Sequence, residues 1–234
     1  MKYGPRYIYE CPKCSSLFQR GTVRSCSFFG DEFFSDGSVY NDFSGHFPSF
    51  TRCKQCGHLF WVDDAKEVGK VDIDNPPLFK TGELITIYAY IERVRERYGS
   101  KWDGSPNAEF LSLDNYYFAI NNKFYRTDKE EKYLRKLAWW LENFRDKSGV
   151  AAKRSSVELQ RRVRNMRRLA QLLDESDPYF MQGLMKADIY RQLGEFDNCL
   201  LILNRLNLPD HGQFIAQMRE QCEKGNKLVF CYKY

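Results

Sequence analysis

The sequence predicts an α+β fold, in which a small β module is followed by an all-helical domain. Two C-x-x-C hooks, Cys11–Cys14 and Cys53–Cys56, are flanked by short aromatic and β-branched runs that are typical of strands. In the C-terminal two thirds of the chain, apolar residues instead recur at a spacing of three and four, which is typical of amphipathic helices. A change of period from 2 to 3.6 along one chain predicts strands first and helices afterwards.

The boundary between these two patterns is predicted at Pro76 and Pro77, because consecutive prolines exclude a helix and favour an extended linker. We therefore expect a small β module at residues 1–75 and a helical domain at residues 76–234. The chain of 234 residues is 43% hydrophobic, enough to build packed cores for both parts.

The strongest chemical signal is the set of four cysteines in the hooks. A tetrahedral Zn²⁺ takes four soft ligands at about 2.3 Å, and each C-x-x-C turn directs two thiolates toward one ion. The predicted Zn²⁺ ligands are Cys11, Cys14, Cys53 and Cys56. Four thiolates close the coordination shell, which favours a structural zinc over a catalytic one. A redox role is less favoured, because neither hook opens a helix in a βαβ unit.

The remaining cysteines and the histidines have less specific interpretations. His46 or His58 could replace a thiolate at the metal, but we expect both to lie at the surface or behind the ligands. Cys26 is expected to be a small buried hydrophobic residue. Because the other cysteines are scattered, reduced thiols in a cytoplasmic protein fit better than a disulfide framework.

The hook sequences Cys-Pro-Lys-Cys and Cys-Lys-Gln-Cys-Gly-His resemble the knuckles of zinc ribbons, over about the first 65 residues. Predicted strands at Tyr7–Glu10 and Leu59–Val62 would enter the first hook and leave the second. The spacer of 38 residues between the hooks is longer than the usual 15–20. It contains the hairpin signal Asp36-Gly37, so we expect an elaborated β insertion there.

Start and stop signals along the rest of the chain predict a series of helices. They begin near Thr81, Ser112, Thr127, Ser155, Asp177, Glu195 and Asp210. The clearest signals are capping boxes at Thr127–Glu130 and Ser155–Glu158, and the stop at Gly194. The helix after Ser155 is expected to bury one apolar stripe, formed by Leu159, Val163, Met166, Ala170 and Leu173. The tail at residues 228–232 is expected to form a short strand or a docked extension.

Residues 187–206 resemble a tetratricopeptide (TPR) repeat. Ala187, Tyr190, the Leu-Gly turn at Gly194 and the small Cys199 stand where that family places such residues. The family's usual tryptophan position holds Gly183 instead. The resemblance implies antiparallel helix pairing, with residues 127–174 as a degenerate neighbour. A zinc-knuckle start followed by TPR-like helices is also loosely similar to uncharacterised bacterial proteins, a similarity that implies no activity.

The charge pattern allows two interpretations. The chain has a net charge of +5, and Arg161, Arg164 and Arg168 would share one helix face. These arginines could track the phosphates of RNA or DNA. The alternative, which we favour, is a solvated helix whose arginines cover core edges and pair with acids.

The sequence contains no Gly-rich phosphate loop, no G-x-S-x-G and no H-E-x-x-H, and it has only three histidines. We therefore expect a non-enzymatic zinc-binding protein whose helical domain mediates interaction with another protein. Nucleic-acid binding through residues 153–168 and the zinc module is the alternative, and a metalloenzyme is a second, less favoured one. We expect no secretory signal and no membrane association.

Overall fold

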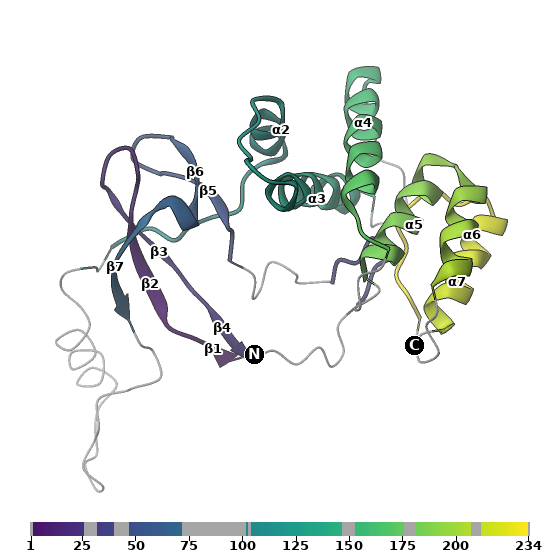
Figure 1. The fold of residues 1–234 in the computed structure, drawn as a ribbon, viewed down its shortest axis with the longest axis horizontal. Coiled ribbons are helices and arrows are strands. Elements are labelled where there is room, and N and C mark those ends of the chain that lie inside the picture. Colours follow the sequence, from purple (N-terminus) through teal and green to yellow (C-terminus); the bar gives the residue numbers. More distant parts are fainter. Residues whose placement is uncertain are drawn as a thin grey trace, which may run out of the picture. The chain divides into compact units, whose positions relative to one another are not determined.

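The computed structural model describes residues 2–25, 32–39, 47–71, 102, 104–146, 153–175, 181–206 and 212–233. Two compact units are present (Figure 1). The β unit comprises Met1–Phe29 and Asp42–Leu111, and the helical unit comprises Gly30–Asn41 and Ser112–Tyr234. The predicted α+β class is confirmed. The helical unit is discontinuous, because it includes a segment from inside the spacer between the hooks.

Two of the sequence-based expectations fall largely on residues that are not described. The predicted boundary at Pro76 and Pro77 and the predicted helix from Thr81 lie outside the described residues, so both stay predictions. Beyond that boundary, residues 104–111 belong to the β unit. There, Gln19 N–H donates to the carbonyl of Pro106 at 2.9 Å, and Ala108 N–H donates to the carbonyl of Gln19 at 2.8 Å.

The β unit contains small antiparallel sheets. In the three-stranded sheet, β2 (Arg6–Glu10) lies between β3 (Leu17–Arg20) and β7 (Lys66–Val71). Strand β5 (Phe50–Arg52) pairs with β6 (Leu59–Trp61). The remaining elements of this unit are β1 (Lys2–Tyr3), β4 (Val23–Ser25), which pairs with β1, and the 3₁₀ helix η1 (Val62–Asp64).

The core of the β unit is small and includes two of the hook cysteines. Cys11 and Cys53 are buried together with Phe18 and Phe60, whose rings pack edge to face with centroids 5.3 Å apart. The two strands predicted beside the hooks are therefore present as β2 and β6. Tyr9 of β2 and Phe60 of β6 pack in the same cluster as the two cysteines.

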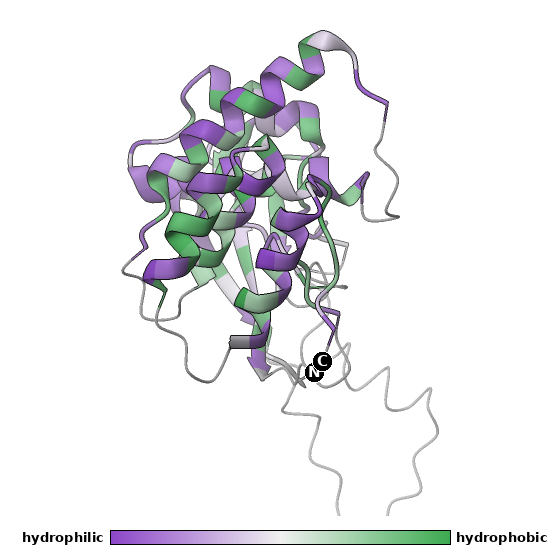
Figure 2. Cartoon of the chain, turned by 90° about the vertical axis from the view of Figure 1, so that its right-hand side faces the viewer, coloured by the Kyte–Doolittle hydropathy of each residue, from purple (hydrophilic) through white to green (hydrophobic). Residues whose placement is uncertain are grey.

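The described residues of the helical unit contain six helices. They are α2 (Leu113–Asn121), α3 (Asp128–Phe144), α4 (Ser156–Leu172), α5 (Met181–Leu193), α6 (Phe196–Arg205) and α7 (Gly212–Glu223). Figure 2 shows hydrophobic and hydrophilic residues side by side along these helices, as expected for helices that bury one face. Helix α3 packs against both α2 and α4, and α5 pairs with α6. The predicted α5–α6 hairpin is thus observed, whereas its assignment to the TPR family stays a prediction.

The helix boundaries follow the local signals. Ser155 and Glu158 form a complete capping box at the start of α4. Thr127 Oγ1 accepts from the N–H of Glu130 at 3.2 Å at the start of α3. Gly194, with a φ of 80°, ends α5. The proposed N-cap Asp177 lies outside the described residues.

Helix α4 departs from its expected stripe. Met166, Ala170 and Leu173 are buried, but Leu159 is 48% exposed and Val163 is 38% exposed. The C-terminal half of α4 thus packs against its neighbours, and the described residues leave the N-terminal half largely uncovered. The expected burial of the full stripe is therefore wrong for its first two members.

The spacer segment 32–39 is a hairpin, as Asp36-Gly37 predicted. Gly37 has a φ of 77°, and its N–H donates to the carbonyl of Phe34 at 2.9 Å. The C-terminal tail lies along this hairpin: Tyr232 N–H donates to the carbonyl of Phe33 at 2.8 Å, and Ser35 N–H donates to the carbonyl of Phe230 at 2.9 Å. The tail is therefore a docked extension of the helical unit.

Candidate metal centre

The first hook is a tight loop at the end of β2. Cys11 N–H donates to the carbonyl of Ser16, and the carbonyl of Cys11 accepts from the N–H of Ser15, both at 2.9 Å. Ser15 has a φ of 56°, a left-handed conformation that favours glycine. This turn places the side chain of Cys14 on the same side as that of Cys11.

The second hook repeats this geometry at the end of β5. Cys53 N–H donates to the carbonyl of His58, and the carbonyl of Cys53 accepts from the N–H of Gly57, both again at 2.9 Å. Gly57, four residues after the first cysteine of its hook, has a φ of 71° and corresponds to Ser15 in the other hook. The two loops are therefore structural repeats. The sequence indicated this left-handed backbone conformation at Gly57, because glycine favours it, but not at Ser15.

The structure brings the four predicted zinc ligands together. The four Sγ atoms all lie within 4.8 Å of one another. The Sγ atoms of Cys11 and Cys56 are 3.8 Å apart, and those of Cys14 and Cys53 are 3.7 Å apart. A tetrahedral ion with metal–sulfur bonds of about 2.3 Å requires sulfurs about 3.8 Å apart, whereas a disulfide requires about 2.05 Å. The spacing fits a shared metal ion.

One side of the centre is buried and the other is open to solvent. Cys11 and Cys53 are buried, Cys56 is half-buried and Cys14 is exposed. Ser16 Oγ lies 3.1 Å from the Sγ atoms of both Cys14 and Cys53. Sequence reasoning missed Ser16, because a serine two residues after a hook is not by itself a metal-site signal.

The thiols differ in acidity. Burial opposes ionisation of Cys53, but hydrogen bonds from the Ser16 side chain and from backbone N–H groups lower its pKa to about 6. The Ser16 side chain also lowers the pKa of Cys14. Burial raises the pKa of Cys11. For Cys56, the His58 N–H has a lowering effect, but burial and the other three sulfurs raise the pKa to about 12.

These shifts have a simple electrostatic meaning. Four thiolates crowded together repel one another, so without a compensating charge only some of them ionise readily. A divalent cation among the four sulfurs favours the thiolate form of every one of them. The arrangement is therefore suited to bind a thiophilic divalent metal such as Zn²⁺, with Ser16 and the backbone N–H groups supporting the ligands.

Of the three histidines, only His58 is described, and its ring is not a member of the ligand cluster. His58 is half-buried, and its ring stacks on Phe60 with centroids 6.1 Å apart. His58 was expected at the surface or behind the ligands, and its half-buried ring lies outside the cluster of the four sulfurs. His46 and His211, together with Cys26, lie outside the described residues.

A small cavity of about 180 Å³ adjoins the centre, bordered by residues 16–18, 51–55 and 106–108. At its edge, Lys54 Nζ pairs with Glu109 Oε1 at 2.6 Å. Thr51 Oγ1 donates to the carbonyl of Glu109 at 2.9 Å, so residues 106–109 are held firmly beside the second hook. The metal centre is thus supported from three separate stretches of the β unit.

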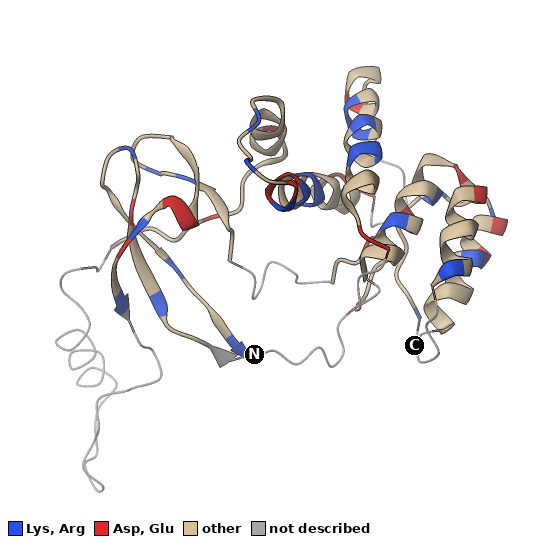
Figure 3. Cartoon of the chain, in the orientation of Figure 1, with Lys and Arg blue, Asp and Glu red and all other residues tan. Residues whose placement is uncertain are grey.

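The arginines proposed as a nucleic-acid surface lie on α4, where Figure 3 shows several bands of basic residues. Arg161 pairs with Asp114 at 3.2 Å and stacks on the ring of Tyr117 at 4.1 Å. Arg168 pairs with Glu131 at 2.7 Å. Arg164 is exposed. Two of the three arginines are therefore engaged with side chains of neighbouring helices.

The chain matches no protein-family model, no curated protein and no solved structure. Fold and site together define a β unit with a four-cysteine centre that is joined to a unit of paired helices. Within the described residues, no helix combines the length and apolar character needed to cross a membrane.

Proposed function

We propose that this chain is a non-enzymatic zinc-binding protein whose helical unit binds another protein. The observation behind the first half is the sulfur geometry: four cysteine sulfurs lie within 4.8 Å of one another, from two hooks of the same backbone shape. The free energy of binding a structural metal contributes to folding. The zinc would therefore hold the ends of β2 and β5 and the two hook loops, residues 11–16 and 53–58, in place.

A non-catalytic role is supported by the ligand count. Catalytic zinc sites use three protein ligands and leave a position for water or substrate. Four thiolates would complete the shell of a tetrahedral ion. The metalloenzyme alternative would need one of them to dissociate.

A protein-binding role is supported by the uncovered apolar residues of the helical unit. Leu159 and Val163, one turn apart on α4, are exposed, and Phe118 on α2 is exposed as well. Exposed apolar side chains that continue a buried helix stripe are a common feature of interaction surfaces. Nucleic-acid binding stays a prediction, and a steep loss of affinity for RNA or DNA with rising salt would support it.

The metal is tested on the full chain purified under reducing conditions. We expect one zinc per chain and protection of the four hook thiols, Cys11, Cys14, Cys53 and Cys56, from alkylation until a chelator is added. Cobalt(II) exchanged into the site should show the absorption bands of tetrahedral thiolate coordination. Cys14→Ser should lose the metal, and Cys231→Ser, the matched control, should retain it. A metal-free native protein whose four hook thiols all react without chelator would contradict the proposal.

The partner is tested by affinity capture with quantitative mass spectrometry. The bait variant carries Leu159→Asp and Val163→Asp, and the control carries Ser156→Asp and Gln160→Asp at exposed polar positions of the same helix. We expect at least one protein to be captured by the wild type and by the control but not by the bait variant. Identical captured sets for all three baits would count against a partner at this surface.

A further inference from the structure

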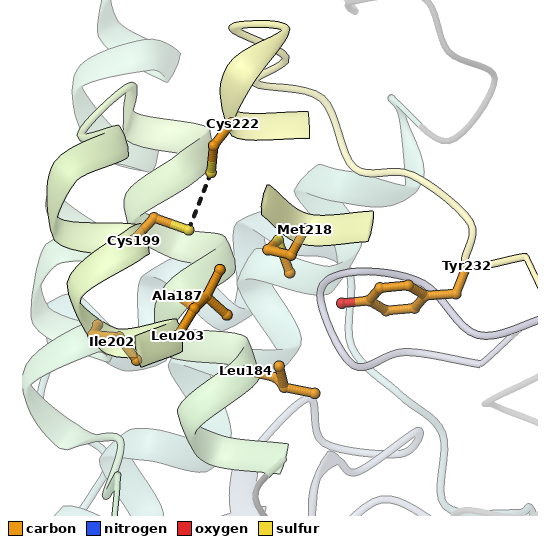
Figure 4. Close-up of a cluster of buried hydrophobic side chains, with 8 residues drawn as sticks. All are labelled: Leu184, Ala187, Cys199, Ile202, Leu203, Met218, Cys222 and Tyr232. Atoms are coloured by element: carbon orange, nitrogen blue, oxygen red, sulfur yellow. Dashed lines mark hydrogen bonds between the residues drawn. The ribbon is translucent and has the colours of Figure 1, made fainter. Parts of the chain in front are cut away.

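The α6 and α7 helices meet at a buried cluster that contains two cysteines (Figure 4). Cys199 is completely buried, and Cys222 is 6% exposed. The cluster consists of Leu184, Ala187, Cys199, Ile202, Leu203, Met218, Cys222 and Tyr232. In Figure 4 the two cysteine side chains point toward each other across the gap between their helices. They are separated by 23 positions in the sequence and are not part of the metal centre.

The two Sγ atoms lie 3.4 Å apart, at hydrogen-bonding distance. A disulfide bond has a length of about 2.05 Å, so the sulfurs need to approach by only about 1.4 Å for a covalent bond. At the metal centre the paired sulfurs are 3.7 and 3.8 Å apart, at the spacing for a shared ion. The α6–α7 contact is closer than either pair. No second group of ligating residues surrounds it among the described residues, so a disulfide is the simpler chemistry there.

The two thiols are not equivalent. Their mutual hydrogen bond lowers the pKa of Cys222 and raises the pKa of Cys199. Cys222 lies in the last turn of α7, one residue before the helix ends at Glu223. Last turns of terminal helices open locally at low free-energy cost. Cys222 is therefore the thiol that meets an oxidant first, and Cys199 is the resolving thiol beneath it.

We propose that Cys199 and Cys222 form a reversible disulfide that joins α6 to α7. The oxidant is a low-molecular-weight disulfide of the glutathione class. The Cys222 thiolate attacks one sulfur of this disulfide, giving a mixed disulfide and releasing one small thiolate. The Cys199 sulfur then loses its proton and attacks the Cys222 sulfur, which releases the second small thiol. Two protein thiols and one small disulfide thus become one protein disulfide and two small thiols, and exchange with excess small thiol reverses the reaction.

The location gives this bond a structural consequence. Tyr232, in the same cluster, packs edge to face on Phe214 of α7 with ring centroids 4.7 Å apart. The tail around Tyr232 pairs with the spacer hairpin through Phe33 and Ser35. A covalent α6–α7 link would therefore fix α7 and help to hold the tail and hairpin that pack beside it. The reduced state leaves α7 free to open from α6.

The test uses the full chain with its metal bound. The protein is equilibrated in glutathione buffers of increasing oxidised fraction, quenched in acid, unfolded, alkylated and mapped as peptides. We expect loss of two alkylatable thiols, a cross-linked peptide joining Cys199 to Cys222, and full recovery of both thiols in excess reduced glutathione. The metal content should stay unchanged, and the oxidised form should unfold several degrees higher than the reduced form, because the bond closes a loop in the unfolded chain.

Variants separate this bond from general thiol oxidation. Cys222→Ala and Cys199→Ala should each abolish the loss of two alkylatable thiols. Cys231→Ala, the matched control in the C-terminal tail, should leave that loss intact. The wild-type peptide map decides the question even if a core variant fails to fold. The proposal is overturned if the hook cysteines oxidise before this pair does. It is also overturned if glutathione stops at a mixed disulfide, or if the cross-link forms only in denaturant. It does not depend on the proposed function, because zinc content and partner capture are read out separately.

Discussion

Asp36 Oδ2 accepts a 2.8 Å hydrogen bond from Asn143 Nδ2, and both side chains are fully buried. Asp36 comes from the spacer between the two metal hooks, and Asn143 is in the last turn of α3. The carbonyl of Asp36 also accepts from Trp140 Nε1 at 3.0 Å. A segment enclosed by the metal ligands in sequence is therefore part of the core of the helical unit. Each end of this segment leads back to a metal hook.

Asp36→Ala should destabilise the helical unit by about 3 kcal/mol, because the amide of Asn143 and the hydroxyl of Ser38 would lose a buried acceptor. The measurement is the urea midpoint of helical circular dichroism. Glu32→Ala, at an exposed position of the same segment, is the control and should change the midpoint little. Zinc content should be unchanged in both variants. Loss of the metal in Asp36→Ala would mean that the two units do not fold separately.

Arg162 and Arg164 provide a matched pair on α4. Arg162 is nearly buried and donates to Asp146, Asn143 and Gln192 at 2.8–3.0 Å. Arg162→Met should cost about 3 kcal/mol of unfolding free energy, because it removes one partner from a buried charged network. Arg164→Met, at an exposed site, should stay within about 0.5 kcal/mol. Chemical denaturation distinguishes the two, and equal effects would contradict the buried network.

Ser16 should tune the metal centre without being a ligand. Ser16→Ala removes the hydroxyl that lies 3.1 Å from two sulfurs, so we expect zinc affinity to fall by about tenfold with one zinc still bound. Competition with a chromogenic chelator measures this. Ser15→Gly, the neighbouring control, relieves a φ of 56° and should bind zinc as tightly as the wild type or more tightly. Unchanged zinc affinity in Ser16→Ala would show that the Ser16 hydroxyl does not support the sulfur ligands.

Glu158 should make α4 sensitive to acid. Hydrogen bonds from the N–H and hydroxyl of Ser155, with help from Arg145, lower its pKa from 4.5 to about 2. Since the folded-state pKa lies below the unfolded one, the stabilisation is complete above about pH 4.5 and disappears as the pH falls through about 2. The difference in urea midpoint between wild type and Glu158→Gln should therefore shrink over this interval. Glu223→Gln, an exposed charge on α7, controls for net charge. A difference that is constant with pH would exclude this linkage.

Local signals in the sequence determined much of the secondary structure. The caps at Ser155 and Thr127 and the stop at Gly194 each act within a few residues. For the same reason the hairpin at Asp36-Gly37 could be predicted from two residues. The α+β class follows from these local patterns, because each pattern favours a helix or a turn without contacts from distant parts of the chain.

Long-range packing decided the rest. Arg162 and Arg164 stand two positions apart in one basic run, yet only contacts with α3 and α5 make the first buried and the second exposed. The spacer hairpin joins the helical unit through Asn143, more than a hundred residues away. Such contacts depend on which faces meet in three dimensions, so no window of sequence contains them. The sequence by itself determined the α+β class and the four cysteines of the cluster that could hold a metal ion, and the tertiary structure decided which unit each segment serves.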